Sequence, residues 1–332
     1  GLGRVSNLRF TQGSCDCIKA FSRSSTRLYK RRYRGRRDYC IQRAILHLDA
    51  SSVDTSRYSL GDFYGKNINP SLKDLILLPG KFDALHLGHK KLLESAASIG
   101  TPLFLTFPGM GDVLGWKPRK PIVPDHERTR ILEEWALSLG ISIVFDQLQF
   151  NQIRALSPEQ FMDLLVSRYS ASGVVCGFNW RFGFKAQGTT DTLQSLAAER
   201  DLKVIVVPSL SVQNETISST RVRRILSEEG DVSTAKLMLG RYYKLFGTLS
   251  GALEKDESLV IDQIENYLPK SGLYEACIQM EGRVAPLWGV VRIQECMQSE
   301  TGQDRILVEG ASHLYCGTSL PVTVELRRRC DE

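Results

Sequence analysis

The chain has 332 residues, of which 42% are hydrophobic and 24% are charged, an ordinary globular composition with enough apolar residues for one or two cores. No uninterrupted apolar run approaches the ~20 residues that a membrane-spanning helix needs, so neither such a helix nor a secretory signal is predicted. The eight cysteines form no CxxC pair and no Cys/His zinc spacing, which indicates free thiols in a reducing compartment and no metal site.

The positive charge is concentrated near the N-terminus. Residues 1–43 carry twelve Lys or Arg against two acids, a net charge of +10, so of the overall +6 the remainder contributes −4. An Arg-rich, Ser-containing and acid-poor segment resembles an organelle transit peptide. The alternative is a basic arm for nucleic acid or a nuclear signal, but no basic and aromatic surface recurs downstream to extend such a footprint. We predict a basic leader over residues 1–65 that directs import into a plastid or, alternatively, a mitochondrion.

Residues 72–240 are predicted to form an α/β domain. Apolar runs that are typical of buried strands alternate with amphipathic helical stretches, at 75–78, 102–107, 141–145, 173–177 and 203–208. Such β/α repetition predicts a doubly wound parallel sheet, in which ligands bind at the carboxyl ends of the strands. Ser157, with Pro158 after it and Gln160 at the capping-box position, predicts a helix start.

Beyond Gly240 the sequence changes to short alternating segments such as "YYKLFGTL", "GLYEACIQM" and "LPVTVELRR". Such segments are typical of antiparallel strands, and we predict a small β-barrel over residues 241–332. The predicted fold class is therefore a Rossmann-like sheet domain followed by an antiparallel β-barrel domain.

Two of the five histidines, His86 and His89, lie where the first predicted strand leads into a helix. A helix N-terminus binds phosphate, and Gly88 between the histidines lets a phosphate approach the backbone. Metal binding would need a third ligand, and no HExxH motif or cysteine companion is visible. We interpret the pair as a stabiliser of phosphoryl charge; the alternative is two histidines that cap and pack at a helix start.

A second helix start is predicted at Ser218, Ser219 and Thr220. Their hydroxyl and backbone N–H groups can bind phosphate, and Arg223 can reach the same anion from the first turn. In isolation, this pattern is equally well explained as an ordinary cap before a basic amphipathic helix.

Three segments in this order resemble the adenylyltransferase domain of prokaryotic-type FAD synthetases. They are "GKFDALHLGH" (80–89), which is similar to the GxFDxxHxGH signature of nucleotidyltransferases, "GFNWRFGFKAQGT" (177–189) and "ISSTRVRRIL" (217–226). The resemblance implies transfer of AMP from MgATP to FMN, with FAD and pyrophosphate as products. An oxygen of the FMN phosphate is the nucleophile, so catalysis is positioning and charge neutralisation. Mg²⁺ is expected to arrive with ATP, with no dedicated protein cage.

The resemblance also assigns residues to roles. The catalytic residues are His86, His89 and Arg223. The ATP contacts are Gly80, Phe82, Asp83, His86, Gly88, His89, Ser218, Ser219, Thr220 and Arg223. The FMN contacts are Phe107, Asn179 and Arg181, although Asn179 is alternatively a turn residue in a Gly-rich loop.

The sequence departs from this family in two places. The segment "TFPGMG" (106–111) stands where relatives have an extra acidic residue and Pro-His-Pro, and Thr216 stands where many carry arginine. We therefore expect contacts with the flavin and with the triphosphate that differ from those of the bacterial enzymes.

Bacterial members append a riboflavin kinase barrel, whose GFPTAN-like stretch should follow Gly247. That stretch is missing here, although the segment 306–326 still resembles the barrel and places Glu309 at the position of the kinase base. The resemblance therefore implies a degenerate kinase barrel, as in plant plastid FAD synthetases. It implies an enzyme that makes FAD from FMN but no FMN from riboflavin.

Two alternatives stay open at this point. One is another nucleotidyltransferase of the superfamily, with nicotinamide mononucleotide, phosphopantetheine or a cytidylyl acceptor as its substrate. The other is a catalytically silent binding protein on the same scaffold, held by the basic arm to RNA or a membrane. The expected partners are the small molecules FMN and ATP, with no nucleic acid and no stable membrane association, and the sequence leaves the oligomeric state open.

Overall fold

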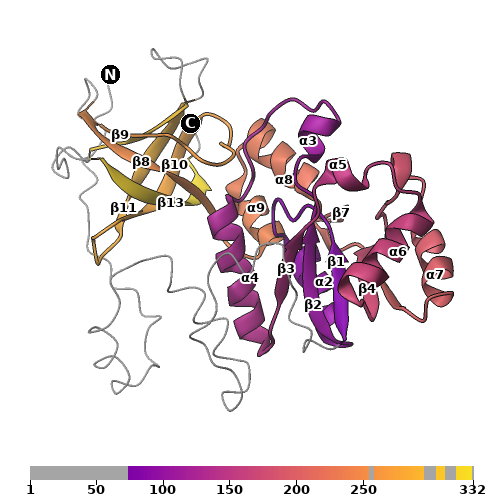
Figure 1. Ribbon diagram of the computed structural model, residues 1–332. Helices are drawn as coiled ribbons and strands as arrows, with labels where there is room; N and C mark the ends of the chain where they lie inside the picture. The colour runs from indigo at the N-terminus through magenta and orange to yellow at the C-terminus, as the bar shows by residue number, and fades with distance from the viewer. Residues whose placement is uncertain (1–73, 254–257, 295–303, 311–318, 331–332) are drawn as a thin grey trace, which may run out of the picture.

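The computed structural model describes residues 74–253, 258–294, 304–310 and 319–330, which form a sheet domain and a barrel domain (Figure 1). The elements of the sheet domain are β1 (Leu75–Pro79), α2 (Leu87–Ala97), β2 (Thr101–Thr106), α3 (Met110–Val113), α4 (Asp125–Leu139), β3 (Val144–Gln147), α5 (Phe150–Ile153), α6 (Pro158–Tyr169), β4 (Gly173–Gly177), α7 (Thr190–Ala198), β5 (Lys203–Val207), β6 (Ser211–Val212), β7 (Glu215–Thr216), α8 (Ser219–Arg224) and α9 (Val232–Leu239). The barrel consists of β8 (Tyr243–Leu253), β9 (Leu259–Asp262), β10 (Gly272–Met280), β11 (Leu287–Gln294), β12 (Arg305–Val308) and β13 (Leu320–Arg329).

The first sheet is parallel and has the strand order β3-β2-β1-β4-β5, which confirms the predicted doubly wound fold. Its central strand β1 is buried on both faces, because Ile76 and Leu78 pack on one side and Leu75 and Leu77 on the other. Helices α2, α4 and α9 cover the first of these faces, and α6 and α7 cover the second (Figure 1). Strand order reverses beside β1, and ligands bind at such a point in open α/β sheets.

The third strand lies later in the chain than its apolar run predicts. The prediction covers 141–145, whereas β3 begins at Val144 and pairs with Leu103 of β2. Helix α4 ends at Gly140 in the left-handed conformation, and the Ile141 amide donates back to the Ala136 carbonyl. Ile141, the first apolar residue of the run, therefore belongs to the end of α4 and not to the strand.

The barrel is closed and antiparallel, in the order β10-β11-β12-β9-β8-β13, as the alternating segments predict. Its interior is filled by every second residue, for example Tyr274, Ala276 and Ile278 on β10. Strand β9 was not among the predicted segments, because it is short and lies in a stretch of mixed polarity. It closes the barrel by pairing with both β8 and β12.

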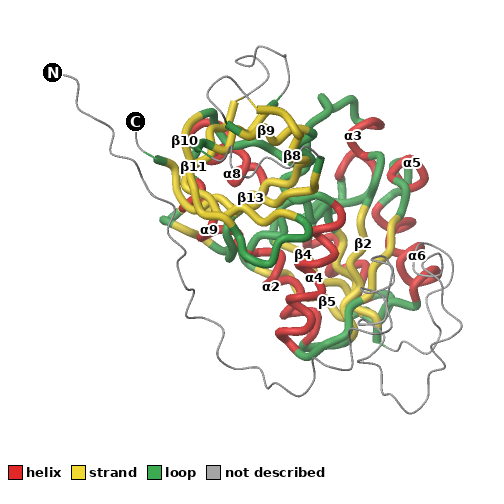
Figure 2. The backbone as a smooth tube through the Cα atoms, turned by 90° about the vertical axis from the view of Figure 1, so that its left-hand side faces the viewer, coloured by secondary structure: helices red, strands yellow, loops and turns green. Residues whose placement is uncertain are grey.

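The two domains share one apolar core. A continuous cluster of buried side chains runs from Ile76 in the sheet to Leu326 in the barrel. Figure 2, which views the molecule from the barrel side, shows the barrel strands packed in front of the sheet domain. Within the described parts of the chain, no helix is long and apolar enough to cross a membrane.

Candidate functional site

The segment between β1 and α2 brings the two motif histidines into contact. His86 is the N-cap residue of α2, and its imidazole stacks on that of His89, with 3.8 Å between ring centroids and 14° between ring planes. Phe82, which is buried, meets the His89 ring edge-on at 5.1 Å and Phe104 of β2 at 4.9 Å. The histidines therefore stand at the carboxyl end of the sheet, on a support of buried aromatic rings.

Both histidines are held in their neutral form. Burial lowers the pKa of His86 to about 4, and burial also lowers the pKa of His89 well below its usual value. The positive charge of Arg241 adds to both shifts. The Nδ1 atoms of both rings are buried and have no hydrogen-bond partner within the described structure. Unsatisfied buried polar atoms of this kind are typical of sites that complete their hydrogen bonds with a ligand.

The glycines of the motif have a steric role. A Cβ atom at Gly88 would lie 3.0 Å from the His86 ring, and one at Gly80 would lie 3.0 Å from the Phe82 ring. A side chain at either position would therefore displace the ring that the site depends on.

Arg241, which follows α9, holds the residues before His86 in place through hydrogen bonds. Its guanidinium donates to the carbonyls of Ala84 (2.8 Å) and Leu85 (2.7 Å), the two residues before His86, and also to that of Leu239. Burial lowers the pKa of Arg241 to about 10, so the side chain remains charged at neutral pH. Nothing in the sequence indicated this contact, because the partners are more than 150 residues apart.

The second motif begins α8 as its sequence predicts. The Ser218 hydroxyl accepts a hydrogen bond from the Arg221 amide, and Ser219 and Thr220 form the first turn. Arg221 itself is buried and donates to the carbonyls of Val212 and Glu215, so it supports the preceding hairpin.

Arg223 joins the two motifs. Its guanidinium donates to the Asp83 carboxylate at 2.6 Å and to the Lys120 carbonyl at 3.0 Å, and it lies 4.8 Å from the Tyr267 ring centroid. Arg223 is 8% exposed, and its Nε has no hydrogen-bond partner among the described residues. Residues 140 positions apart are thus brought together at one edge of the sheet.

The three predicted flavin contacts lie beyond the carboxyl ends of β2 and β4, the two strands that flank β1. Phe107 follows β2 and lies 6.2 Å from Phe161, while Asn179 and Arg181 are exposed in the turn after β4. Trp180, between them, stacks on Phe182 at 4.7 Å. No contact described for these residues joins them to the histidine pair, so their roles stay predictions.

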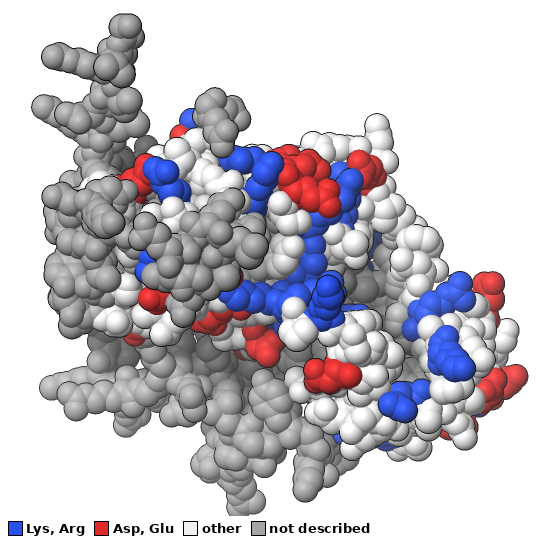
Figure 3. Space-filling view, turned by 90° about the horizontal axis from the view of Figure 1, so that it is seen from above, with Lys and Arg blue, Asp and Glu red and all other residues white. Residues whose placement is uncertain are grey.

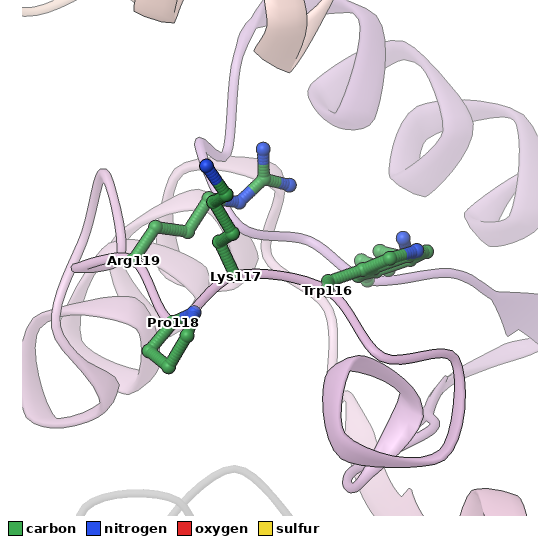
Figure 4. A pocket seen from close by; sticks show the side chains of 5 residues that line it. Trp116, Lys117, Pro118 and Arg119 are labelled. Carbon is green, nitrogen blue, oxygen red and sulfur yellow. The ribbon is translucent and has the colours of Figure 1, made fainter.

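A basic hollow beside the motif was missed by the sequence reading. It has a volume of about 450 Å³ and is lined by Lys81, Trp116, Lys117, Pro118 and Arg119 (Figure 4). The run "WKPRKP" was the available signal, but charge in a loop is ordinarily solvated and does not by itself indicate a site.

Comparisons with known proteins agree with this arrangement. Residues 69–221 match the family described as FAD synthetase. FAD synthetase 1, chloroplastic, of Arabidopsis thaliana is 34% identical over 255 residues, which cover 69% of this chain and 72% of that protein. FAD synthetase 2, chloroplastic, of the same plant is 36% identical over 225 residues, which cover 62% of this chain and 61% of that protein.

A solved structure supports the fold alone. The crystal structure described as a macrolide-efflux protein from Streptococcus pneumoniae superposes with a TM-score of 0.65 at 20% identity, and the match covers 78% of this chain and 86% of that one. The motifs, the sheet that carries them and the plant relatives agree, and the chain belongs to the FAD synthetase family, as an enzyme of the FMN adenylyltransferase class.

Proposed function

We propose that this chain transfers AMP from MgATP to FMN and has no riboflavin kinase activity. An oxygen of the FMN phosphate attacks the α-phosphorus of ATP, and the bond from that phosphorus to the bridging oxygen of pyrophosphate breaks. FMN brings its own ionised nucleophile, so no side chain has to supply one. The proposal depends above all on the convergence of the stacked histidines and Arg223 at one edge of the sheet.

The surroundings of each proposed catalytic residue suit the role that we propose for it. Neutral His86 and His89 each offer one N–H donor to the oxygens of the transferring phosphate. The helix N-terminus at α2 adds backbone N–H groups that favour the same anion. Arg223, held in place by Asp83, would carry the charge of the departing pyrophosphate.

Mg²⁺ fits this site as part of the MgATP complex. In the described parts of the chain, no three His, Cys, Asp or Glu side chains lie together as metal ligands. The carboxylate of the motif, Asp83, already pairs with Arg223. When bound, the cation would neutralise phosphate charge, and oxygens of ATP and water would supply most of its ligands.

Two observations favour the absence of kinase activity. Thr248 and Leu249, at the place expected for the kinase hallmark, continue β8 and pair with Asp262 and Ile261 of β9. The retained Glu309 accepts two hydrogen bonds from Arg292 on the same carboxylate oxygen, at 2.5 and 3.1 Å. A base engaged in this way is not expected to support phosphoryl transfer.

The test is a separation of flavins by chromatography. Purified chain with FMN and MgATP should form FAD and pyrophosphate in equal amounts, whereas riboflavin and MgATP should give neither FMN nor FAD. Nicotinamide mononucleotide, phosphopantetheine and a cytidylyl acceptor serve as competing substrates. Turnover of one of these in place of FMN would overturn the substrate assignment, and sustained FMN formation from riboflavin would overturn the monofunctional proposal.

The division into domains and the location are part of the same proposal. We assign residues 72–240 to adenylyl transfer and residues 241–332 to a barrel retained for folding. The leader over residues 1–65 lies outside the described residues, and we propose that it directs import into plastids, since both plant relatives are named as chloroplastic. A reporter fused to the leader should enter plastids, and a cytosolic reporter would refute this.

A further inference from the structure

Four of the five residues that line the basic hollow lie between α3 and α4, in the segment that follows the departure from the bacterial enzymes at 106–111. We call residues 116–119 the tryptophan loop. In Figure 4 the charged ends of Lys117 and Arg119 point to the same side of this loop, and the Trp116 ring lies farther along it. Lys81, from the histidine motif, places its Nζ 3.7 Å from the centroid of the Trp116 ring and completes the lining.

The charges in this hollow are not balanced by acids. Among the described residues, no carboxylate forms an ion pair with Lys81, Lys117 or Arg119, whereas the adjacent Lys120 pairs with Asp304 at 2.8 Å. Burial and then the charge of Arg119 lower the pKa of Lys81, and the charge of Asp83 opposes this shift. Seen from above, basic side chains gather between the barrel and the sheet domain, with a group of acidic side chains beside one end of them (Figure 3). Converging cations without counter-charges favour the binding of an anion.

Two connections place the hollow next to the proposed site. Lys81 stands two residues before Asp83, whose carboxylate binds Arg223 and also accepts from the Ile122 amide at 3.2 Å. The Lys120 carbonyl, one residue beyond the tryptophan loop, accepts from Arg223 at 3.0 Å. An anion in the hollow would therefore lie beside the group expected to carry the triphosphate.

We propose that Lys81 and the tryptophan loop form an additional phosphate-binding subsite of this enzyme. Its ligand is a phosphate group of a substrate or product, either the phosphate of FMN or the pyrophosphate portion of ATP. Arg119 supplies a planar fork suited to phosphate oxygens, and the two lysines supply point charges. The inference rests on the proposed function, since that function brings both phosphate sources to this edge of the sheet.

The test compares two double variants with the same change in charge. Lys117→Ala/Arg119→Ala removes one lysine and one arginine from the hollow, and Lys203→Ala/Arg283→Ala removes one of each from exposed positions elsewhere. Calorimetric titration of the full chain with inorganic pyrophosphate and, separately, with FMN shows which anion loses affinity. Steady-state kinetics then gives KM for ATP and for FMN.

The first double variant should lose about tenfold or more in affinity for one of the two anions, with a matching rise in KM for the substrate that carries it. The control pair should bind and turn over like the wild type. The variant Lys117→Arg/Arg119→Lys keeps both charges and should recover most of the affinity, which separates binding from a folding defect. Equal behaviour of the two alanine pairs, in a wild-type chain that forms FAD, would overturn the subsite alone. A wild-type chain that forms no FAD would instead overturn the proposed function.

Discussion

His86 and His89 bury two Nδ1 atoms that find no hydrogen-bond partner in the described part of the chain, an arrangement that costs stability unless a ligand uses it. Replacement of either with alanine should leave the fold intact and lower FAD formation about 10²- to 10³-fold, as when one oxyanion-hole donor is removed. Single-turnover rates measure this loss, and circular dichroism checks the fold. A variant with near-wild-type turnover would remove that histidine from the mechanism.

The same burial predicts a pH dependence of folding stability. The pKa of His86 is about 4 in the folded chain and about 6.5 when unfolded, so between these values the unfolded chain binds the extra proton. The free energy of unfolding should therefore fall as the pH falls below 6.5, by about 2 kcal/mol for this group by pH 5. Urea unfolding at pH 7 and pH 5 measures the loss.

His86→Gln cannot take up this proton, and it is the control for the pH prediction. The variant should lose about 2 kcal/mol less stability than the wild type between pH 7 and pH 5. Equal losses in both proteins would show that His86 does not titrate in this range.

At the scale of elements, the end of α9 is packed against the start of α2. Gly240 ends α9 with a φ of 72°, and a Cβ there would lie 2.6 Å from the side chain of Leu87, the residue after His86. Gly240→Ala should destabilise the chain by more than the ~1–2 kcal/mol of a left-handed alanine, because Leu87 must also move. Its kcat should fall as well. Urea unfolding and FAD formation measure the two effects.

Gly140 provides a matched control on α4. It also ends a helix with a positive φ, 65°, but a Cβ there would meet nothing within 4 Å. Gly140→Ala should therefore show only the backbone cost and keep full activity. If both variants lose the same stability and activity, the contact with Leu87 has no role in the site.

At the scale of the whole molecule, the two domains are expected to unfold together. Asn266 is fully buried between them, where its side chain donates to the Ile122 and Lys244 carbonyls and accepts from the Phe246 amide. Because the apolar core is also continuous, calorimetry should show one cooperative transition.

Asn266→Ala leaves buried polar groups unpaired and should shift that whole transition to lower temperature, at a cost of about 1–3 kcal/mol. Two separate transitions in the wild type, or a variant in which only part of the transition moves, would show that the barrel and the sheet domain are energetically independent.

Local features of this protein were determined by the sequence. The histidine motif, the Ser218 cap and the strand at 173–177 depend on neighbouring residues, so their spacing was sufficient to predict them. The alternation of apolar residues was equally sufficient for the barrel, except for β9, which is too short to show a pattern.

Contacts between distant segments were decided only by the tertiary structure. The Arg223–Asp83 ion pair, the contacts of Arg241 with the Ala84 and Leu85 carbonyls, and the hollow formed by Lys81 with the tryptophan loop join residues that no sequence pattern relates. A charged side chain in a sequence has many possible partners, and only the packing of the domains selects one. The sequence therefore predicts which chemistry is present, and the fold sets which charges lie beside a counter-charge.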